Sequence, residues 1–288
     1  MKTVLVTGAS TGLGLALSEL LIGSTDFHLV LTAREESIDR FTQEGITESE
    51  RVWIRPLDVT VASQREDRVK EINDLLGGVD ILINNAGIAC RAVVEHVTEP
   101  ERLAQMDINF RSPMELTRLV LPSMRAKRAG KIINVSSVGG MMAMPTMAVY
   151  SASKFALEGA SEALFYEVKP WGINVSLVQP GFINSASFQR VVYTALSDES
   201  IASRNESYYS HYHYMEPFIQ RMMGAAVATP QRVARKILKT ALQKNPPLRV
   251  PATIDAHLFG LMRRFLPRRL YHWALYRNLP HIKEWGPK

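Results

Sequence analysis

A tyrosine and a lysine four residues apart have the residue types and the spacing for acid–base chemistry. Tyr150 and Lys154 open the run YSASKFALEGASEALFYEV, in which apolar residues recur every three or four positions. This periodicity predicts a helix with both side chains on one face. A cation beside a phenol favours the phenolate and brings its pKa from about 10 toward the working range. The pair therefore fits a general acid or base, although these residues alone also allow an ordinary helical tyrosine beside a solvated lysine.

A glycine-rich turn between a strand and a helix could hold a nucleotide phosphate. An apolar, β-rich segment at 3–7 precedes Gly8, Gly12 and Gly14, and a helical pattern follows at 15–22. Glycines permit the turn, the approach of backbone to a pyrophosphate and close packing of the helix on the strand, while free N–H groups at the helix start would face the anion. The alternative is a plain tight turn.

The end of the second predicted strand bears on the choice of cofactor. Residues 27–32 form this strand, and Ala33 and Arg34 follow. In dinucleotide-binding folds an acid at this point accepts from the free ribose hydroxyls of NAD, whereas an arginine pairs with the additional phosphate of NADP. The sequence thus favours NADP(H) over NAD(H). The alternative is a solvated arginine that the adjacent Glu35 and Glu36 neutralise.

The rest of the chain alternates between strands and helices. Further strands are predicted at 51–57, 80–84, 131–135 and 173–178, and further helices at 61–76, 99–128 and from about 230. This alternation predicts an α/β fold: a single-domain Rossmann fold with a doubly wound parallel sheet of about seven strands and helices on both faces. We expect a nucleotide-binding and catalytic domain over 1–253 and, over 254–288, a basic amphipathic helical C-terminal extension of the same domain.

The ordered set of motifs resembles the short-chain dehydrogenase/reductase family. The matching segments are TGASTGLG at 7–14, Asp58 with Val59, NNAG at 84–87, Asn109, Ser137, YSASK at 150–154, and Pro180 with Gly181. Each segment is a weak signal alone, but together they have the order and spacing of the family. The words SSVGGMM at 136–142 and SKFALEG at 153–159 are similar to the 17-beta-hydroxysteroid and retinol dehydrogenase branch.

This resemblance implies a catalytic tetrad of Asn109, Ser137, Tyr150 and Lys154. Tyr150 would give its proton to a carbonyl oxygen as hydride arrives, or accept it in the opposite direction, and Ser137 would hydrogen-bond that oxygen. Lys154 would lower the pKa of the tyrosine and bind the nicotinamide ribose. Asn109 would hold a water that links Lys154 to solvent.

The resemblance also implies which residues bind the cofactor. They are Gly8, Ser10, Thr11, Gly12, Leu13, Gly14, Arg34, Asp58, Val59, Asn85, Ala86, Gly87, Tyr150, Lys154, Pro180, Gly181, Ile183 and Ser185. The glycine-rich turn would face the pyrophosphate, the 58–59 pair the adenine, and the 180–183 loop the nicotinamide. Ser185 stands where many relatives have threonine and keeps the hydroxyl.

An insertion at about 186–229 is expected to lie beside the substrate. Its aromatic and methionine side chains are Phe188, Tyr193, Tyr208, Tyr209, Tyr212, Tyr214, Met215, Phe218, Met222 and Met223. Relatives use this insertion as a mobile lid, and thioether and aromatic groups make adaptable apolar pockets for bulky lipophilic ketones or alcohols. The expected substrate contacts are Ser137, Met142, Met144 and Tyr150. Many of the aromatics could instead serve packing alone.

The positive charge of the chain is concentrated at its C-terminus. The net charge is +6, yet residues 231–288 contain 13 Lys+Arg and 2 Asp+Glu, which leaves the first 230 residues at −5. Residues 254–278 are predicted to form two short basic amphipathic helices that Pro267 separates. They could lie on an anionic membrane surface, or cover the pocket or a subunit interface. Their alternating apolar residues argue against a nucleic-acid partner.

Composition and the N-terminus favour a cytoplasmic protein, peripheral to a membrane if the C-terminal helices bind lipid. Cys90 is the only cysteine, the start lacks a signal-peptide pattern, and no run of about 18 apolar residues occurs. His211 and His213 have no third ligand at useful spacing, so no metal is expected.

These features together predict an NADP(H)-dependent oxidoreductase that interconverts a carbonyl and an alcohol. Its substrate would be hydrophobic, resembling a steroid, a retinoid or another lipid, and family habit implies a homodimer or homotetramer. The alternative is a non-catalytic NADP-binding regulator on the same fold. A regulator has no need of Tyr150 and Lys154 together with Ser137, which favours the enzyme.

Overall fold

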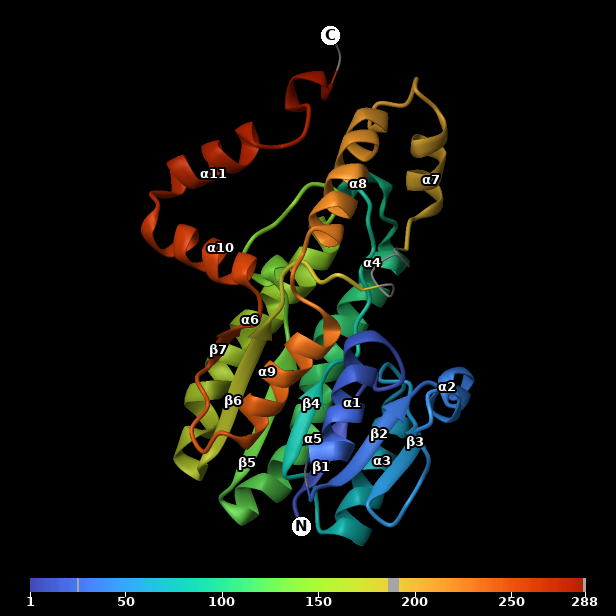
Figure 1. Cartoon of the computed structure of the whole chain (residues 1–288), viewed down its shortest axis with the longest axis vertical. Coiled ribbons are helices and arrows are strands. Elements are labelled where there is room, and N and C mark those ends of the chain that lie inside the picture. The colour runs from blue at the N-terminus through green and yellow to red at the C-terminus, as the bar shows by residue number, and fades with distance from the viewer. Residues whose placement is uncertain (25, 186–191, 287–288) are drawn as a thin grey trace.

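The computed structural model describes residues 1–24, 26–185 and 192–286 of the 288-residue chain. Among these residues, seven strands form one parallel sheet in the order β3-β2-β1-β4-β5-β6-β7 (Figure 1). The strands are β1 (Thr3–Val6), β2 (His28–Ala33), β3 (Val52–Pro56), β4 (Ile81–Asn84), β5 (Gly130–Val135), β6 (Ile173–Gln179) and β7 (Arg249–Pro251). The strand order reverses between β1 and β4, and ligands bind beside such a switch point at the carboxyl ends of the strands. The predicted doubly wound Rossmann fold is confirmed.

Helices pack on both faces of this sheet. The α-helices of the described residues are α1 (Gly12–Ser24), α2 (Asp39–Gln43), α3 (Ala62–Leu76), α4 (Glu99–Met106), α5 (Ser112–Lys127), α6 (Ala148–Val168), α7 (Ala195–Ala202), α8 (Tyr209–Gly224), α9 (Pro230–Leu242), α10 (Ile254–Phe265) and α11 (Arg268–Arg277). Of these, α1 and α9 pack on one face and α3, α5 and α6 on the other. In β1, Val4 and Val6 join the core under α1 and α9, whereas Leu5 joins the core under α3, α5 and α6. Alternate residues of a strand point to opposite faces, so a strand covered on both sides is apolar throughout.

The helix predicted over 99–128 has a π-helical segment in its middle. Asp107–Arg111 is π-helical and separates α4 from α5. Within it, Asn109 binds the backbone of Ile88 through both side-chain atoms: Oδ1 accepts from the N–H and Nδ2 donates to the carbonyl, each at 2.9 Å. The widened turn thus projects the Asn109 amide to the loop after β4; π-helical turns of this kind are frequent at functional sites.

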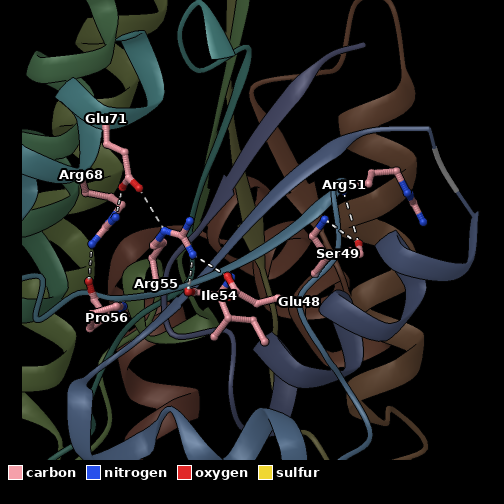
Figure 2. Close-up of polar contacts among 9 residues, drawn as sticks. Glu48, Ser49, Arg51, Ile54, Arg55, Pro56, Arg68 and Glu71 are labelled. Atoms are coloured by element: carbon pink, nitrogen blue, oxygen red, sulfur yellow. Dashed lines mark hydrogen bonds and ion pairs between the residues drawn. The ribbon is translucent and has the colours of Figure 1, made fainter. Parts of the chain in front are cut away.

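Polar side chains cover the outer border of edge strand β3 (Figure 2). Glu48 Oε1 accepts from the Ile54 N–H at 3.0 Å and from Arg55 Nη1 at 2.5 Å. The Ile54 N–H is the main reason that the pKa of Glu48 lies below its usual range. Arg55 Nε also donates to Glu71 of α3 at 3.1 Å, and Arg68 pairs with the same carboxylate. The network gives the Ile54 N–H at the sheet edge a hydrogen-bond acceptor and connects α3 to strand β3.

The C-terminal helices extend past the carboxyl ends of the strands (Figure 1). As predicted, two helices flank Pro267, with α10 ending at Phe265 and α11 beginning at Arg268. Tyr271 of α11 joins Val138 and Met142 in one buried cluster, so these helices cover the loop that follows β5. Within the part of the chain that the structure describes, no helix is both long and apolar enough to cross a membrane.

Candidate active site

The loop after β4 holds the glycine-rich turn after β1 in place. Thr7 Oγ1 accepts from the N–H groups of Asn85 and Ala86 at 3.0 and 3.1 Å. Asn85 Nδ2 donates back to the carbonyls of Thr7 and Gly8 at 3.1 and 2.9 Å. Hydrogen bonds therefore join the loop after β1 to the loop after β4, and the Asn85 side chain is used to hold the glycine-rich turn.

The turn leaves no room for side chains at its glycines. Gly8 and Gly12 have φ angles of 63° and 54°, which L side chains rarely adopt. A Cβ at Gly14 would lie 2.0 Å from the carbonyl oxygen of Gly8 and 2.7 Å from Asn85 Nδ2. The start of α1 follows directly, and its first turn contains no acidic residue. An exposed backbone at a positive helix end is what a pyrophosphate requires, so this turn fits a dinucleotide.

Other residues predicted around the turn differ in their accessibility. Ser10 is buried, Thr11 is exposed and Leu13 is half-buried. Val59 is buried in the core under α3. Asp58 Oδ1 accepts from both the N–H and the hydroxyl of the residue two positions on, at 2.9 and 2.6 Å, which fixes its orientation.

Arg34 has an acidic neighbour at the end of β2. Its Nε lies 3.0 Å from Glu36 Oε1, and both side chains are 63% exposed. A pair this exposed is worth little and exchanges partners easily. Arg34 is therefore accessible to a phosphate, in competition with Glu36.

Tyr150 lies in the first turn of α6, beside Ser137 after β5. Ser137 Oγ accepts from the Gly139 N–H at 3.0 Å, and a Cβ at Gly139 would lie 2.8 Å from the Tyr150 ring and 3.4 Å from Ser137 Oγ, so the two side chains lie close together. Burial raises the pKa of Tyr150 by more than its interaction with Ser137 lowers it. The sequence predicts that Lys154 lowers the pKa of Tyr150, and this lowering is not found. Lys154 Nζ lies 6.0 Å from the centre of the Tyr150 ring, and the effect of burial on the phenol is larger. The phenol is accordingly held in its protonated form near neutral pH.

Lys154 is almost fully buried one turn further along α6. Its Nζ donates to the Val135 carbonyl at 2.9 Å. Burial lowers the pKa of Lys154 to about 8, and the carboxylate of Glu158 partly opposes this shift. Glu158 is itself 6% exposed; Gln179 Nε2 donates to it at 2.9 Å and Arg249 Nε at 3.2 Å. A buried acid thus supports the charge of the lysine from the same face of the helix.

Asn109 reaches this group through Ser153. Asn109 Nδ2 donates to Ser153 Oγ at 3.0 Å, and that hydroxyl donates to the Tyr150 carbonyl at 2.7 Å. A Cβ at Gly87 would lie 3.1 Å from Asn109 Oδ1 and 3.7 Å from Lys154 Nζ. The four residues of the predicted tetrad therefore converge at the carboxyl edge of β4 and β5, and glycine keeps the space between two of them open.

The loop after β6 is bound on two sides. The Val138 N–H donates to the Pro180 carbonyl at 2.6 Å. From the C-terminal side, Thr253 Oγ1 accepts from the Gly181 N–H at 2.9 Å. Asp255 Oδ2 accepts from the next N–H along, that of Phe182, at 2.8 Å. The start of α10 is therefore tied to the loop predicted to meet the nicotinamide.

The last predicted cofactor residues end in a segment that is only partly described. The Ile183 side chain is 1% exposed and packs in the core, which leaves its main chain to face a ligand. Ser185 is half-buried at the end of the described loop. Phe188 and the rest of 186–191, the first part of the predicted lid, lie outside the described residues.

The two methionines predicted at the substrate lie under the C-terminal helices. Met142 is 4% exposed and packs with Val138 and Tyr271, and Met144 is half-buried beside the same cluster. The wall of the site on this side therefore combines the loop after β5 with α10 and α11.

Three residues that sequence reasoning did not select also hold the site. They are Thr7, Ser153 and Glu158. Glu158 had a detectable signal, since it lies four residues after Lys154 and thus on the same helix face. Thr7 and Ser153 stand inside recognised motifs, but only the structure shows what their hydroxyls bind.

Comparison with known proteins identifies the family of the chain. A family model described as short chain dehydrogenase matches residues 2–195, about two thirds of the chain. The chain belongs to the short-chain dehydrogenase family. The matched segment contains the glycine-rich turn, the tetrad and the sheet from β1 to β6, so this family member is an oxidoreductase with a nucleotide-binding fold.

Curated relatives match nearly the whole chain. The 3-ketodihydrosphingosine reductase of Bacteroides thetaiotaomicron is 36% identical over 280 residues, which cover 95% of this chain and 96% of the relative. The 17-beta-hydroxysteroid dehydrogenase type 1 of Homo sapiens is 32% identical over 280 residues, 92% of this chain and 78% of the relative. The resemblance to the hydroxysteroid dehydrogenase branch is thereby confirmed at the level of the family.

Solved structures have the same fold. A short-chain dehydrogenase from Streptomyces avermitilis superposes with a TM-score of 0.79 at 29% identity, covering 96% of this chain and 98% of that one. Two Burkholderia short-chain dehydrogenases, each 23% identical with a TM-score of 0.72, show the fold alone. The one from B. cenocepacia, covering 96% of this chain and 99% of its own, is in complex with NADP, and the one from B. phymatum, covering 96% of both chains, is in complex with NAD.

Proposed function

We propose that this short-chain dehydrogenase interconverts a carbonyl and an alcohol on a hydrophobic substrate with NADP(H), and that Tyr150 is its acid or base. The observation that carries the proposal is the proximity of Tyr150 and Ser137, since a Cβ at Gly139 would lie 2.8 Å from the Tyr150 ring and 3.4 Å from Ser137 Oγ, with Lys154 one turn away on the same helix. Two hydroxyls meeting at a dinucleotide-type sheet edge are suited to bind one carbonyl oxygen.

The residues would divide the work as follows. The bound nicotinamide supplies or accepts the hydride. Ser137 orients the carbonyl oxygen, and Tyr150, which burial keeps protonated, donates its proton to that oxygen as negative charge develops. The raised pKa of the phenol keeps Tyr150 protonated near neutral pH, as its role as donor in the reductive direction requires. Lys154, with a pKa of about 8, remains mostly charged there and can bind a ribose hydroxyl.

A lipophilic substrate is supported by the side chains near the tetrad and by the named relatives. Met141, Met144 and Phe259 are half-buried around the cluster that follows β5. Flexible thioether and aromatic groups accommodate large apolar molecules. The relatives' names specify a sphingoid ketone and a steroid, and both are bulky and apolar.

The preference for NADP rests on Arg34. We expect Arg34→Ala to weaken NADPH binding by about tenfold and NADH binding little, because only NADP has the additional phosphate. Glu36→Gln should act in the opposite direction, since it removes the competing carboxylate at 3.0 Å. Fluorescence titrations with both nucleotides measure this. Equal effects of Arg34→Ala on both nucleotides would dispose of the phosphate assignment.

The activity is tested by NADPH oxidation over a panel of ketones ordered by lipophilicity. Turnover should rise with lipophilicity, and Tyr150→Phe should lose nearly all of it while nucleotide affinity stays close to that of the wild type. Tyr166→Phe is the matched control, because Tyr166 lies on the same helix and is 65% exposed. Nucleotide binding without turnover on any ketone or alcohol would support the regulator instead.

A further inference from the structure

Helices α10 and α11 have a second apolar face, which none of the residues that the structure describes covers. The exposed side chains of α10 are Ile254, Leu258, Leu261 and Phe265, and those of α11 are Leu270, Trp273 and Tyr276. They are between 46% and 80% exposed. Their spacing of three or four residues places them on one side of each helix. We call these seven residues the outer stripe.

The inner faces of the same helices serve a different purpose. Phe259, Met262 and Leu266 pack toward the cluster of Met142 and Tyr271. The inner faces of α10 and α11 therefore cover the loop beside the site, and the residues of the outer stripe do not contribute to this cover. An amphipathic helix of a soluble domain needs one apolar side, so an additional exposed one indicates a docking surface.

The border of the outer stripe is strongly basic. Across Ile254–Arg277 there are five arginines, at 263, 264, 268, 269 and 277, and one acid, Asp255. Asp255 Oδ2 accepts a hydrogen bond from the Phe182 N–H at 2.8 Å. Arg263 binds the Met141 carbonyl and lies over Phe155, whereas Arg264, Arg268 and Arg269 are exposed. Apolar side chains rimmed by exposed cations are complementary to an anionic surface with an apolar interior.

This charge pattern disfavours a second copy of the chain as the occupant. Two-fold pairing places the same patch on both sides of an interface. The arginines of one copy would then oppose those of the other, and like charges in contact are unfavourable. An anionic bilayer has the opposite charge and offers hydrocarbon to the exposed aromatic and aliphatic groups.

We propose that the outer stripe of α10 and α11 docks this protein on the surface of an anionic lipid bilayer, without spanning it. The inference goes beyond the proposed function and does not depend on turnover. Docking would hold the loop of Met141, Met142 and Met144 close to the lipid, because the inner faces of the same helices pack on that loop.

Vesicle co-sedimentation of the full chain, without nucleotide or substrate, tests the docking. The probes are vesicles of phosphatidylcholine alone and of phosphatidylcholine mixed with an equal amount of phosphatidylglycerol. We expect sedimentation with the mixed vesicles, little with the neutral ones, and release by high salt. A chain that stays in solution with both kinds of vesicle would overturn the proposal.

Two double variants separate the apolar and the charged contributions. Leu258→Ser with Leu261→Ser, and Arg268→Glu with Arg269→Glu, should each reduce partitioning onto mixed vesicles by about tenfold or more. The matched controls are Leu75→Ser, at a leucine 66% exposed on α3, and Arg235→Glu with Lys239→Glu on the exposed side of α9. All four variants change exposed positions, so each should fold. Equal loss in variants and controls, or no loss in any, would refute the assignment of the surface.

Trp273 provides a direct reporter of contact. It is 54% exposed in the outer stripe, and its emission should shift to shorter wavelength when mixed vesicles are added. The shift should be absent in Trp273→Phe. Sedimentation velocity without vesicles completes the test: a dimer that Leu258→Ser with Leu261→Ser converts to monomer, combined with no vesicle binding, would assign the stripe to a second copy. If the protein binds mixed vesicles but reduces no ketone, the proposed function is refuted and the docking proposal stands.

Discussion

Lys154 keeps a charge in a place that disfavours it. The side chain is 6% exposed, and burial is the main reason that its pKa is about 8 instead of 10.5. A folded-state pKa below the unfolded one means that the unfolded chain binds more protons between these two values. The folded state therefore becomes relatively more stable as pH rises from about 8 toward 10.5, and bears the full penalty below pH 8. A residue that lowers stability here is explained by function.

Replacing this lysine by methionine should therefore stabilise the fold while removing activity. We expect Lys154→Met to raise the free energy of unfolding near pH 7 by about 1 kcal/mol, because the gain from removing the buried ammonium exceeds the cost of leaving the Val135 carbonyl without its donor and Glu158 without a nearby positive charge. The gain should shrink near pH 10. Urea denaturation at both pH values measures it, with the exposed Lys236→Met as control. A variant less stable than the wild type at both pH values would contradict the account.

In the proposed reaction we expect Glu158 to act through Lys154 and not on the substrate. Its carboxylate raises the pKa of the lysine, opposing burial. Glu158→Gln removes the charge but keeps an amide that can bond to Gln179, so the pKa of Lys154 should fall below about 8. If turnover requires the charged lysine, the alkaline limb of the pH–rate profile should move to lower pH by about half a unit or more. Glu162→Gln is the matched control, because Glu162 pairs with the outer side of Arg249 at 2.6 Å; equal profiles for both variants would exclude this role.

Helix α1 contains two glycines with opposite surroundings, Gly14 in its first turn and Gly23 near its end. A Cβ at Gly14 would lie 2.0 Å from the Gly8 carbonyl, whereas nothing lies within 4 Å of a Cβ at Gly23. We expect Gly14→Ala to destabilise the fold by about 2–4 kcal/mol and to weaken nucleotide binding, and Gly23→Ala to stabilise it by about 0.5–1 kcal/mol. Thermal unfolding with and without nucleotide measures both. Equal behaviour of the two alanine variants would show that the tight approach at Gly14 is unimportant.

The sequence predicted the features that depend on a single helix, strand or turn, and it missed features that depend on contacts between elements. Strand and helix periodicity, the glycine-rich turn and the Tyr150–Lys154 spacing are local, and the structure places them as predicted. The π-helical segment at Asp107–Arg111 depends on the bonds of Asn109 to a distant loop, and β7 is three residues long, so neither has a local signal. The direction of the Tyr150 pKa was missed for the same reason, because burial is set by the packed surroundings and the spacing shows only the cation.

The tetrad and the C-terminal helices lie in different parts of the chain. The family match ends at residue 195, after the turn and the tetrad, whereas α8 to α11 follow it. The charge is divided in the same way, with +11 on residues 231–288 and −5 on the rest. The C-terminal part must nevertheless be fixed to the catalytic part if it is to position a substrate. The structure makes this connection at the loop after β6, where Thr253 and Asp255 hold Gly181 and Phe182.

Removing one of these contacts should release the C-terminal helices without unfolding the sheet. Asp255→Ala leaves the Phe182 N–H without its acceptor, so we expect a loss of about 1–2 kcal/mol and faster tryptic cleavage after Arg264, Arg268 and Arg269. Asp198→Ala is the matched control, since Asp198 also lies in the first turn of a helix, α7, and is exposed. Timed proteolysis with mass detection compares the three proteins. Because α10 and α11 cover the loop with Met142, the release should also raise the KM for a lipophilic ketone more than it lowers kcat. Identical cleavage rates in the wild type and both variants would mean that the helices are held by their apolar inner faces alone.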